Sequence, residues 1–225
     1  MVDNVIFSPR ANLRFNPTQN INLRLSYSSG FRAPQAFDED MHIENVGGTV
    51  AMIERAKDLK EEKSQSFSVS ADMYHRFGAF QTNLLIEGFY TRLTDVFVLG
   101  KPYDRGDGIL VKTRSNGPGA KVMGLTLEGK VAYLSILQIQ AGLTLQRSRY
   151  DEPHKWHDDA PAEKKIFRTP DTYGYFTATC TPIKPLSIAL SGTYTGRMLV
   201  QRMDITAENA ELGKMPERKA EAIRT

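Results

Sequence analysis

The sequence has a single cysteine among its 225 residues, Cys180. One thiol excludes an intrachain disulfide and a thiolate metal cluster, and its position within a strand-like segment predicts a packed, unreactive side chain. The sequence also lacks any run of eighteen or more apolar residues. This excludes a membrane-spanning helix but leaves a β-barrel open, because barrel strands carry only alternating hydrophobicity.

Charge of one sign is not in large excess, since 29 lysines and arginines stand against 26 acidic residues and are spread along the chain. We therefore expect no nucleic-acid partner. The Gly-x-Ser-x-Gly elbow, the phosphate-cradling glycine loop and the dinucleotide fingerprint are all missing, so we expect neither catalysis nor a cofactor. The start, MVDNVIFSPR, has no secretory leader, although a barrel needs export, and we expect a trimmed chain or a fragment.

Two long stretches, 80–98 and 136–148, alternate apolar and polar residues. Successive strand side chains point to opposite sides, so each stretch has one apolar and one polar face. Strands of a soluble sandwich usually run only about 5 to 6 residues before a turn. The length of the alternation therefore favours the wall of a membrane barrel.

Short and long breaks alternate along the chain. Turn signals at 16–20, 76–79, 133–135 and 181–185 are brief, whereas the breaks at 31–62, 100–118, 150–168 and after about 200 are long and rich in charge, glycine or proline. This is the pattern of an up-and-down barrel with short periplasmic turns and long extracellular loops. Eight strands are predicted, in four hairpins: 8–15, 21–30, 63–75, 80–99, 120–133, 136–148, 169–181 and 186–200.

The fold prediction is an all-β, antiparallel, up-and-down transmembrane β-barrel, with residues 1–200 forming the wall. Its apolar face carries Leu23, Leu25, Tyr27, Phe67, Val69, Ala71, Met73, Phe80, Leu84, Ile86, Tyr90, Leu125, Leu127, Ile188, Leu190 and Tyr194. Its polar face carries Arg24, Ser68, Asp72, Asn83, Glu87, Glu128 and Lys130. Residues 49–62 have a helix-compatible composition, and the charged tail, 201–225, is expected to be loop, helix or disordered.

A family resemblance rests on three blocks in order. The first, LRLSYSSGFRAPQAFDED at 23–40, is similar to a signature region of TonB-dependent outer-membrane receptors, in which a strand ends before a long outer loop. The matching residues are Gly30, Phe31, Arg32, Ala33 and Pro34. Apart from the resemblance, Pro34 removes a ladder donor and stops the strand, and Arg32 has a donor fork suited to tying loop carboxylates such as Asp38 or Glu39.

The other two blocks resemble further strand entries of the same family. Leu59, Lys60 and Glu62 match a Leu-Lys-Pro-Glu element, with Glu61 in place of the proline. The segment 115–129 is similar to an Asn-Gly lead into a strand, with Thr126 where an acidic residue is frequent. The resemblance spans about 5–200 and implies part of a roughly 22-stranded barrel, which encloses a plug domain and couples to TonB.

The best candidate for chemistry is HKWHDD at 154–159, where two histidines and an aspartate are suited to approach a metal or an iron chelate and the tryptophan offers a stacking face. No third distant ligand is evident, so no metal site is assigned. We expect ligand contacts from residues of the long loops: Arg32, His42, Tyr103, Arg105, His154, Trp156 and His157.

The leading hypothesis is a fragment of an outer-membrane TonB-dependent receptor for a bulky nutrient, such as a ferric siderophore, cobalamin or another metal chelate. By resemblance, its partners are that nutrient, outer-membrane lipid, its own plug domain and the TonB energy-coupling complex. Two alternatives remain open at this point. One is a self-contained small outer-membrane barrel acting as an adhesin or enzyme, and the other is a soluble all-β binding module.

Overall fold

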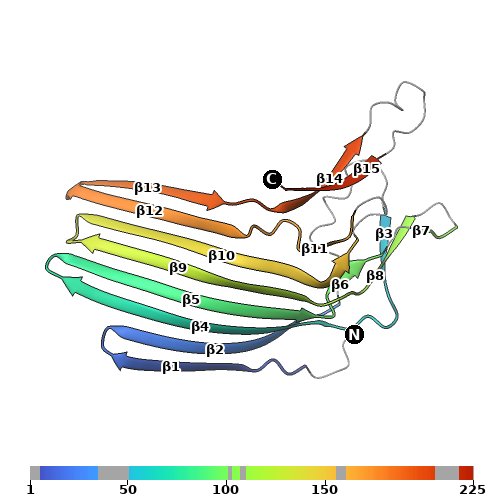
Figure 1. Cartoon of the computed structure of the whole chain (residues 1–225), viewed down its shortest axis with the longest axis horizontal. Coiled ribbons are helices and arrows are strands. Elements are labelled where there is room, and N and C mark those ends of the chain that lie inside the picture. The colour runs from blue at the N-terminus through green and yellow to red at the C-terminus, as the bar shows by residue number, and fades with distance from the viewer. Residues whose placement is uncertain are drawn as a thin grey trace.

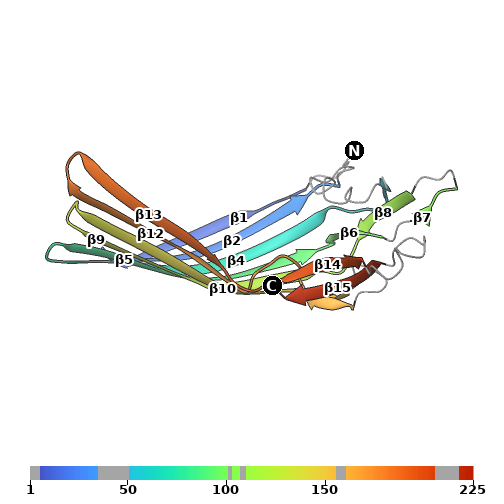
Figure 2. The same cartoon turned by 90° about the horizontal axis from the view of Figure 1, so that it is seen from above.

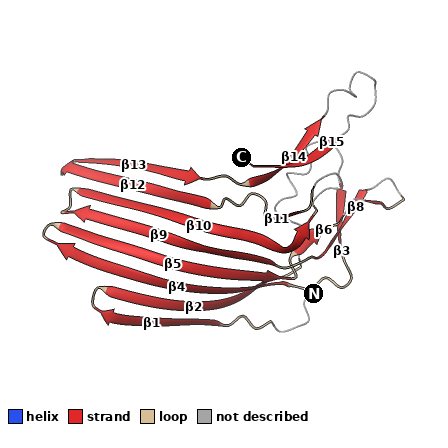
Figure 3. Cartoon of the chain, in the orientation of Figure 1, coloured by secondary structure: helices blue, strands red, loops and turns tan. Residues whose placement is uncertain are grey.

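A computed structural model describes residues 6–34, 51–100, 103–106, 110–155, 161–205 and 218–224. Every regular element in them is a strand, as Figure 3 shows. The strands are β1 (Arg10–Thr18), β2 (Ile21–Arg32), β3 (Ala51–Arg55), β4 (Glu62–Phe77), β5 (Phe80–Thr94), β6 (Phe97–Leu99), β7 (Tyr103–Asp104), β8 (Leu110–Asn116), β9 (Ala120–Tyr133), β10 (Leu137–His154), β11 (Glu163–Lys165), β12 (Thr172–Ile183), β13 (Leu186–Thr195), β14 (Leu199–Ile205) and β15 (Arg218–Arg224).

Eight long strands form one antiparallel sheet in the order β1-β2-β4-β5-β9-β10-β12-β13, with β11 paired to β10. Tight turns close β1–β2, β4–β5, β9–β10 and β12–β13 at one end, the turn end, on the left of Figure 1. The long connections gather at the opposite end, the loop end. Gly78, in the β4–β5 turn, has a φ of 59°, a conformation that glycine adopts without strain. Eight wall strands in four hairpins are confirmed, but the last one ends at Thr195 rather than at the predicted residue 200, and β14 follows it outside the wall.

The register sorts side chains into two faces. One cross-strand row through the middle of the sheet joins Ala71, Ile86, Leu127, Leu143 and Gly174 on the outer face. The adjacent row joins Ser70, Glu87, Thr126, Thr144 and Tyr173 on the inner face. Every residue predicted for the apolar or the polar face of the wall lies on the face predicted for it.

The wall exposes apolar side chains and buries polar ones, which is the reverse of the arrangement in a water-soluble protein. Leu25, Val69 and Leu190 on the outer face are 52%, 59% and 62% exposed, whereas Thr144 and Ser148 on the inner face are buried. Figure 2 shows one curved layer of long strands, with no second sheet packed on either face of the described wall. A soluble sandwich needs its apolar faces to meet each other. The soluble-module alternative is therefore wrong.

The described sheet is also open, because β1 and β13 are its two edges and do not pair with each other. An eight-stranded barrel that closes on itself would join these edges. The arrangement instead fits one section of a larger wall.

A second sheet, the loop sheet, occupies the loop end in the order β3-β8-β6, with β7 paired to β8. Two expectations are corrected here. Residues 49–62 were expected to be helix-compatible, but β3 is a strand that pairs in parallel with β8, a partner far away in sequence. A single strand was expected over 80–99, but Asp95, with a φ of 55°, ends β5, and β6 leaves the wall to join the loop sheet.

The tail after residue 200 was expected to be loop, helix or disorder. The described part instead forms the hairpin strands β14 and β15, which pair only with each other. Strands pair through backbone hydrogen bonds, which form whatever the charge of the side chains. A charged composition alone therefore does not exclude a hairpin.

Candidate functional site

The inner face carries a hydrogen-bonded group at the centre of the wall, made of Glu128 on β9, Gln140 on β10 and Tyr175 on β12. The Gln140 amide donates to Glu128 Oε1 and to Tyr175 Oη, both at 2.9 Å, and the Tyr175 hydroxyl donates to Glu128 Oε2. The carboxylate therefore accepts hydrogen bonds from two neighbouring strands. These hydrogen bonds tie three strands together.

A second inner-face group lies nearer the turn end. Asp72 on β4 accepts hydrogen bonds from Tyr74 Oη at 2.7 Å and from the amide of Asn83 on β5. Hydroxyl pairs connect other strands at the same face, with Ser66 and Thr91 2.9 Å apart. The inner face thus carries hydrogen-bonded polar groups on several strands, with apolar residues such as Leu85 between them.

Asn116, at the end of β8, ties the loop sheet to the wall. Its Oδ1 accepts from the Lys60 backbone N at 2.8 Å, and its Nδ2 donates to the carbonyls of Lys60 at 3.0 Å and Asp95 at 2.8 Å. Glu62 adds a fourth link by accepting from the Phe97 backbone N at 3.1 Å. The loop sheet therefore has a defined position above the loop end of the wall.

Replacing Asn116 with alanine is expected to loosen this attachment by about 1–2 kcal/mol, because three hydrogen bonds are lost and their partners are partly exposed to water. Hydrogen exchange should then quicken in β3, β6 and β8 and stay unchanged in β9. Ser115→Ala, one residue earlier, is the matched control. Equal exchange in Asn116→Ala and Ser115→Ala would contradict the role of Asn116.

Three predicted contact residues lie at or near the loop sheet. Arg32 ends β2 and places its guanidinium 5.6 Å from the centroid of the Phe97 ring, a cation–π contact. Tyr103 is exposed on β7, and Arg105 Nη1 lies 3.4 Å from Glu54 Oε1. The structure thus brings Arg32 to β6, places Tyr103 on β7 and brings the Arg105 side chain to Glu54 on β3.

His154 stands apart, at the end of β10, where its ring lies 5.4 Å from that of Tyr150. Burial lowers the pKa of His154 and raises that of Tyr150, so both are neutral at pH 7. His42, Trp156 and His157, and the proposed Arg32 partners Asp38 and Glu39, lie outside the described residues. Ala33 and Pro34 follow β2 without further pairing, so the strand stops where the proline was expected to stop it.

In the described part of the chain, no three His, Cys, Asp or Glu side chains come together as a metal site would require. No described helix is long and apolar enough to cross a bilayer. The sequence did not predict the hydrogen bonds of Asn116, the contact of Arg32 with Phe97 or the hydrogen bonds that join Glu128 to Gln140 and Tyr175. An Asn-Gly pair at 116–117 marks a turn, but which carbonyls the asparagine binds depends on the fold.

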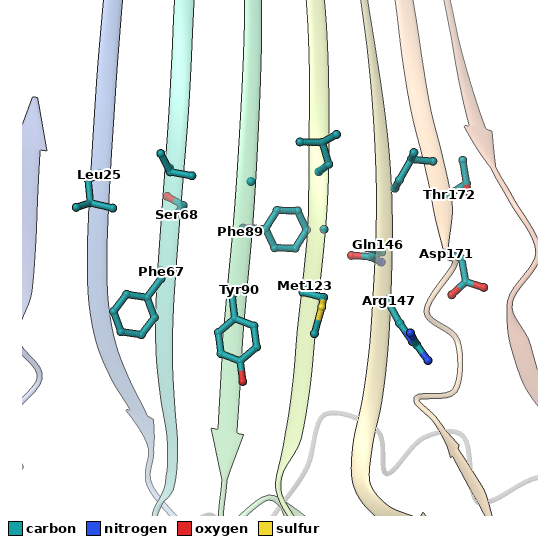
Figure 4. Close-up of a pocket in the computed structure, with 15 residues that line it drawn as sticks. Leu25, Phe67, Ser68, Phe89, Tyr90, Met123, Gln146, Arg147, Asp171 and Thr172 are labelled. Carbon is teal, nitrogen blue, oxygen red and sulfur yellow. The ribbon is translucent and has the colours of Figure 1, made fainter. Parts of the chain in front are cut away.

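A hollow lies on the outer face, away from the predicted contacts. It is a shallow, mostly apolar groove across β4, β5, β9 and β10, lined by side chains such as Phe67, Val69, Tyr90, Met123 and Leu125. Gly88 also lines this groove. Figure 4 shows the groove from Leu25 on one side to Asp171 and Thr172 on the other.

Comparison with known proteins gives one family. The family model described as "TonB dependent receptor-like, beta-barrel" matches residues 2–205. A comparison with curated protein sequences found no match.

Solved structures show the same fold. The FrpB iron transporter from Neisseria meningitidis is 16% identical with a TM-score of 0.58, and the match covers 85% of this chain and 27% of that one. The siderophore receptor PirA from Pseudomonas aeruginosa is 17% identical, with a TM-score of 0.58 and coverage of 86% and 35%. The alcaligin receptor FauA from Bordetella pertussis is 15% identical, with a TM-score of 0.53 and coverage of 87% and 32%.

The chain spans about a quarter to a third of the length of these solved relatives. The open edges at β1 and β13 agree with a section of a longer wall. The family match, the outer apolar face and the loops gathered at one end all lead to the same assignment. The chain belongs to the TonB-dependent receptor family and forms part of its β-barrel.

Proposed function

We propose that this chain is part of an outer-membrane receptor that imports a bulky metal chelate, such as a ferric siderophore or cobalamin, with energy supplied through TonB. The observation that carries the proposal is the reversed polarity of the wall. The outer face exposes Leu25, Val69 and Leu190, and polar side chains on the inner face form hydrogen bonds with one another. Such a sheet is stable with acyl chains outside and an enclosed polar interior.

The inner face is suited to hold a plug domain. Glu128, Glu87 and Asp72 place carboxylates along it, where they can accept hydrogen bonds from a protein surface that fills the interior. Transport needs no covalent chemistry from these residues. The plug and the TonB complex are proposed as partners on the strength of the family match.

The loop end is the proposed capture site. Arg32, His42, Tyr103, Arg105, His154, Trp156 and His157 are the proposed contacts. Arg105 and Glu54 are each about two-fifths exposed, so an anionic chelate can compete with the carboxylate for the guanidinium. Support for a metal chelate comes from the named relatives, which are an iron transporter, a siderophore receptor and an alcaligin receptor.

Deleting the gene that encodes this chain tests the function. Uptake of one radiolabelled ferric siderophore, or of cobalamin, should be lost, should return on complementation, and should be abolished by a protonophore in the wild type. The protein should fractionate with the outer membrane. Unchanged uptake of every chelate tested, or recovery of the protein in the cytosol, would contradict the proposal.

Arg105→Ala should weaken chelate binding about tenfold, the effect of losing one charge-assisted hydrogen bond. Binding to whole cells is the measurement. Lys184→Ala is the matched control, because Lys184 is an exposed cation in the β12–β13 turn, at the other end of the wall. Equal affinities for the two variants would remove Arg105 from the capture site.

A further inference from the structure

A row of cations crosses the outer face of the wall at the loop end. Arg92 on β5, Lys121 on β9, Arg149 on β10 and Lys165 on β11 are successive cross-strand partners. These four residues are called the basic row. On its other side the same row continues through Gln65 on β4 and Ser29 on β2. The basic row projects from the same face as the apolar side chains, not into the interior.

The height of the basic row follows from the aromatic residues of the outer face. Tyr27, Phe67, Tyr90 and Met123 form the row immediately below it, and Phe77, Phe80 and Tyr133 form a row at the turn end. Rings touch within both rows, with centroids 4.8 Å apart for Tyr27–Phe67 and for Phe80–Tyr133. Aromatic residues gather at both interfaces of a membrane barrel.

Ten residues separate Phe67 from Phe77 on β4. At about 3.3 Å per residue the two aromatic rows lie about 33 Å apart along the strand, and at a tilt of about 40° this spans about 25 Å, the height of a barrel's apolar band. The basic row is two residues beyond that band. It therefore lies at headgroup depth in the leaflet next to the loop end.

The basic row holds more positive charge than its neighbours neutralise. Lys121 Nζ lies 2.9 Å from Asp151 Oδ1, Arg92 Nη2 lies 3.8 Å from Asp151 Oδ2, and Lys165 Nζ lies 2.6 Å from Asp171 Oδ2. A hydrogen bond from Lys121 lowers the pKa of Asp151, which is ionised. Within the described part of the chain no carboxylate forms a salt bridge with Arg149.

Like charges placed directly opposite each other on neighbouring strands are destabilising. The basic row contains three such pairs in succession, Arg92–Lys121, Lys121–Arg149 and Arg149–Lys165. Two carboxylates pair with a row of four cations, so a local excess of positive charge remains, and a bound anion would reduce it. The arrangement therefore favours a negatively charged ligand at this height.

Two hollows adjoin the basic row. A pocket of about 310 Å³ is lined by Ser29, Lys63, Gln65, Arg92 and Thr94, which supply two cations, two hydroxyls and an amide on one side of the row. The Lys63 ammonium is also 3.1 Å from Glu61 Oε1. The pKa of the Glu61 carboxyl group is lowered by a hydrogen bond from the Glu61 backbone and, to a smaller extent, by one from Lys63.

The second hollow is the apolar groove, which begins one row below the basic row and runs toward mid-membrane. Figure 4 shows that the Arg147 side chain and the Tyr90 hydroxyl, at the end of this groove nearest the loop end, both point toward the loop end. Long cationic side chains reach toward headgroups in this way. An apolar groove below and cations above match the two parts of a lipid.

We propose that the basic row and the adjoining groove form a binding site for a phosphorylated lipid of the outer leaflet, with phosphate on Arg92, Lys121 and Arg149 and an acyl chain in the groove. Arginine and lysine bind phosphate by charge-assisted hydrogen bonds, and basic clusters beside the apolar band select anionic headgroups. The inference rests on the proposed function only in that the chain lies in an outer membrane with the loop end outward.

The test uses the complete receptor that contains this chain, purified in detergent, and bisphosphorylated lipid A as the probe. The variant Arg92→Gln, Lys121→Gln, Arg149→Gln should bind the probe roughly a hundredfold more weakly, since each cation near a charged surface contributes about 1 kcal/mol. Arg14→Gln, Arg24→Gln, Lys130→Gln removes three cations from the inner face and should leave the affinity unchanged. Lipid A stripped of its phosphates should bind the parent no better than the triple variant binds the intact lipid.

Equal affinity of parent and triple variant for lipid A would overturn the proposal. So would inorganic phosphate binding to the basic row as tightly as lipid A, because the site would then take the free ion. If the triple variant fails to assemble, Arg149→Gln alone should show about a fivefold loss that shrinks as salt is raised. If only the lipid site is wrong, chelate uptake stays intact. If the proposed function is wrong, the parent protein does not fractionate with the outer membrane.

Discussion

Leu127→Arg is expected to destabilise the assembled wall by about 2–4 kcal/mol, the cost of a cation at the middle of the lipid-facing surface. Leu127 lies on β9 between Ile86 and Leu143, four residues from Met123 and six from Tyr133, and so is near the centre of the apolar band. An arginine there has to extend far along the wall to reach headgroups. Urea unfolding of the receptor reconstituted in lipid vesicles measures the effect.

Thr126→Arg is the matched control, because it places the same side chain one residue away on the inner face. Thr126 lies opposite Glu87, and it shares a hydrogen bond of 3.0 Å with Thr144. The loss of that hydrogen bond is offset by the nearby carboxylate, and a change below about 1 kcal/mol is expected. If the two variants were equally destabilised, the assignment of outer and inner faces would be wrong.

Gly124→Val is expected to destabilise the wall by about 3 kcal/mol, at the upper end of the range for overpacking. Gly124 lies opposite Phe89, whose ring covers it on the inner face. A Cβ at Gly124 would lie 2.6 Å from both the Leu145 carbonyl oxygen and Phe89 Cζ, and the carbonyl belongs to backbone that cannot move freely. The valine would force the ring out and strain the β9–β10 ladder.

Gly129→Val, on the same strand, is the control for changing a glycine to valine. Nothing lies within 4 Å of a Cβ at Gly129, and it faces outward beside Leu84 and Ala141. Its valine should be tolerated or slightly stabilising, because lipid accepts the added methyl groups. Comparing the urea midpoints of the two variants checks the expectation, and a larger loss at Gly129 would count against it.

Glycine–aromatic pairing recurs across the wall and explains why these glycines are not simply flexible points. Gly142 lies beneath the Tyr175 ring and Gly192 beneath the Phe176 ring, with added Cβ atoms 2.6 Å and 2.5 Å from ring carbons. Covering a strand glycine with a cross-strand aromatic ring restores packing where a side chain is missing. At Gly142 the arrangement also holds Tyr175 in reach of Glu128.

Much of the wall was predictable because its signals are local. Alternation with a period of two assigns each residue to a face, and a turn signal such as the one at 76–79 or at 181–185 sets where a strand reverses. Once consecutive strands pair through tight turns, the cross-strand rows follow. The sequence alone therefore assigns Leu23, Val69, Ile86 and Leu127 to one face.

The loop end was poorly predicted because its structure depends on contacts between distant segments. Met52 in β3 pairs in parallel with Val111 in β8, and the sequence around 49–62 has no periodicity that signals such a partner. Asp95 interrupts an alternating run, and its carbonyl and the following strand bind β8. The contact of the Arg32 guanidinium with the Phe97 ring likewise joins segments that are far apart in sequence.

By itself the sequence determined that this is a membrane wall with one apolar and one polar face, since each side chain's face follows from its own position along a strand. Only the tertiary structure decided which residues become neighbours across the sheet. Arg92, Lys121 and Arg149 are far apart in sequence, and each alone is an ordinary surface cation. Register places them in one row above the aromatic residues, because antiparallel pairing converts equal distances from successive turns into equal height in the membrane.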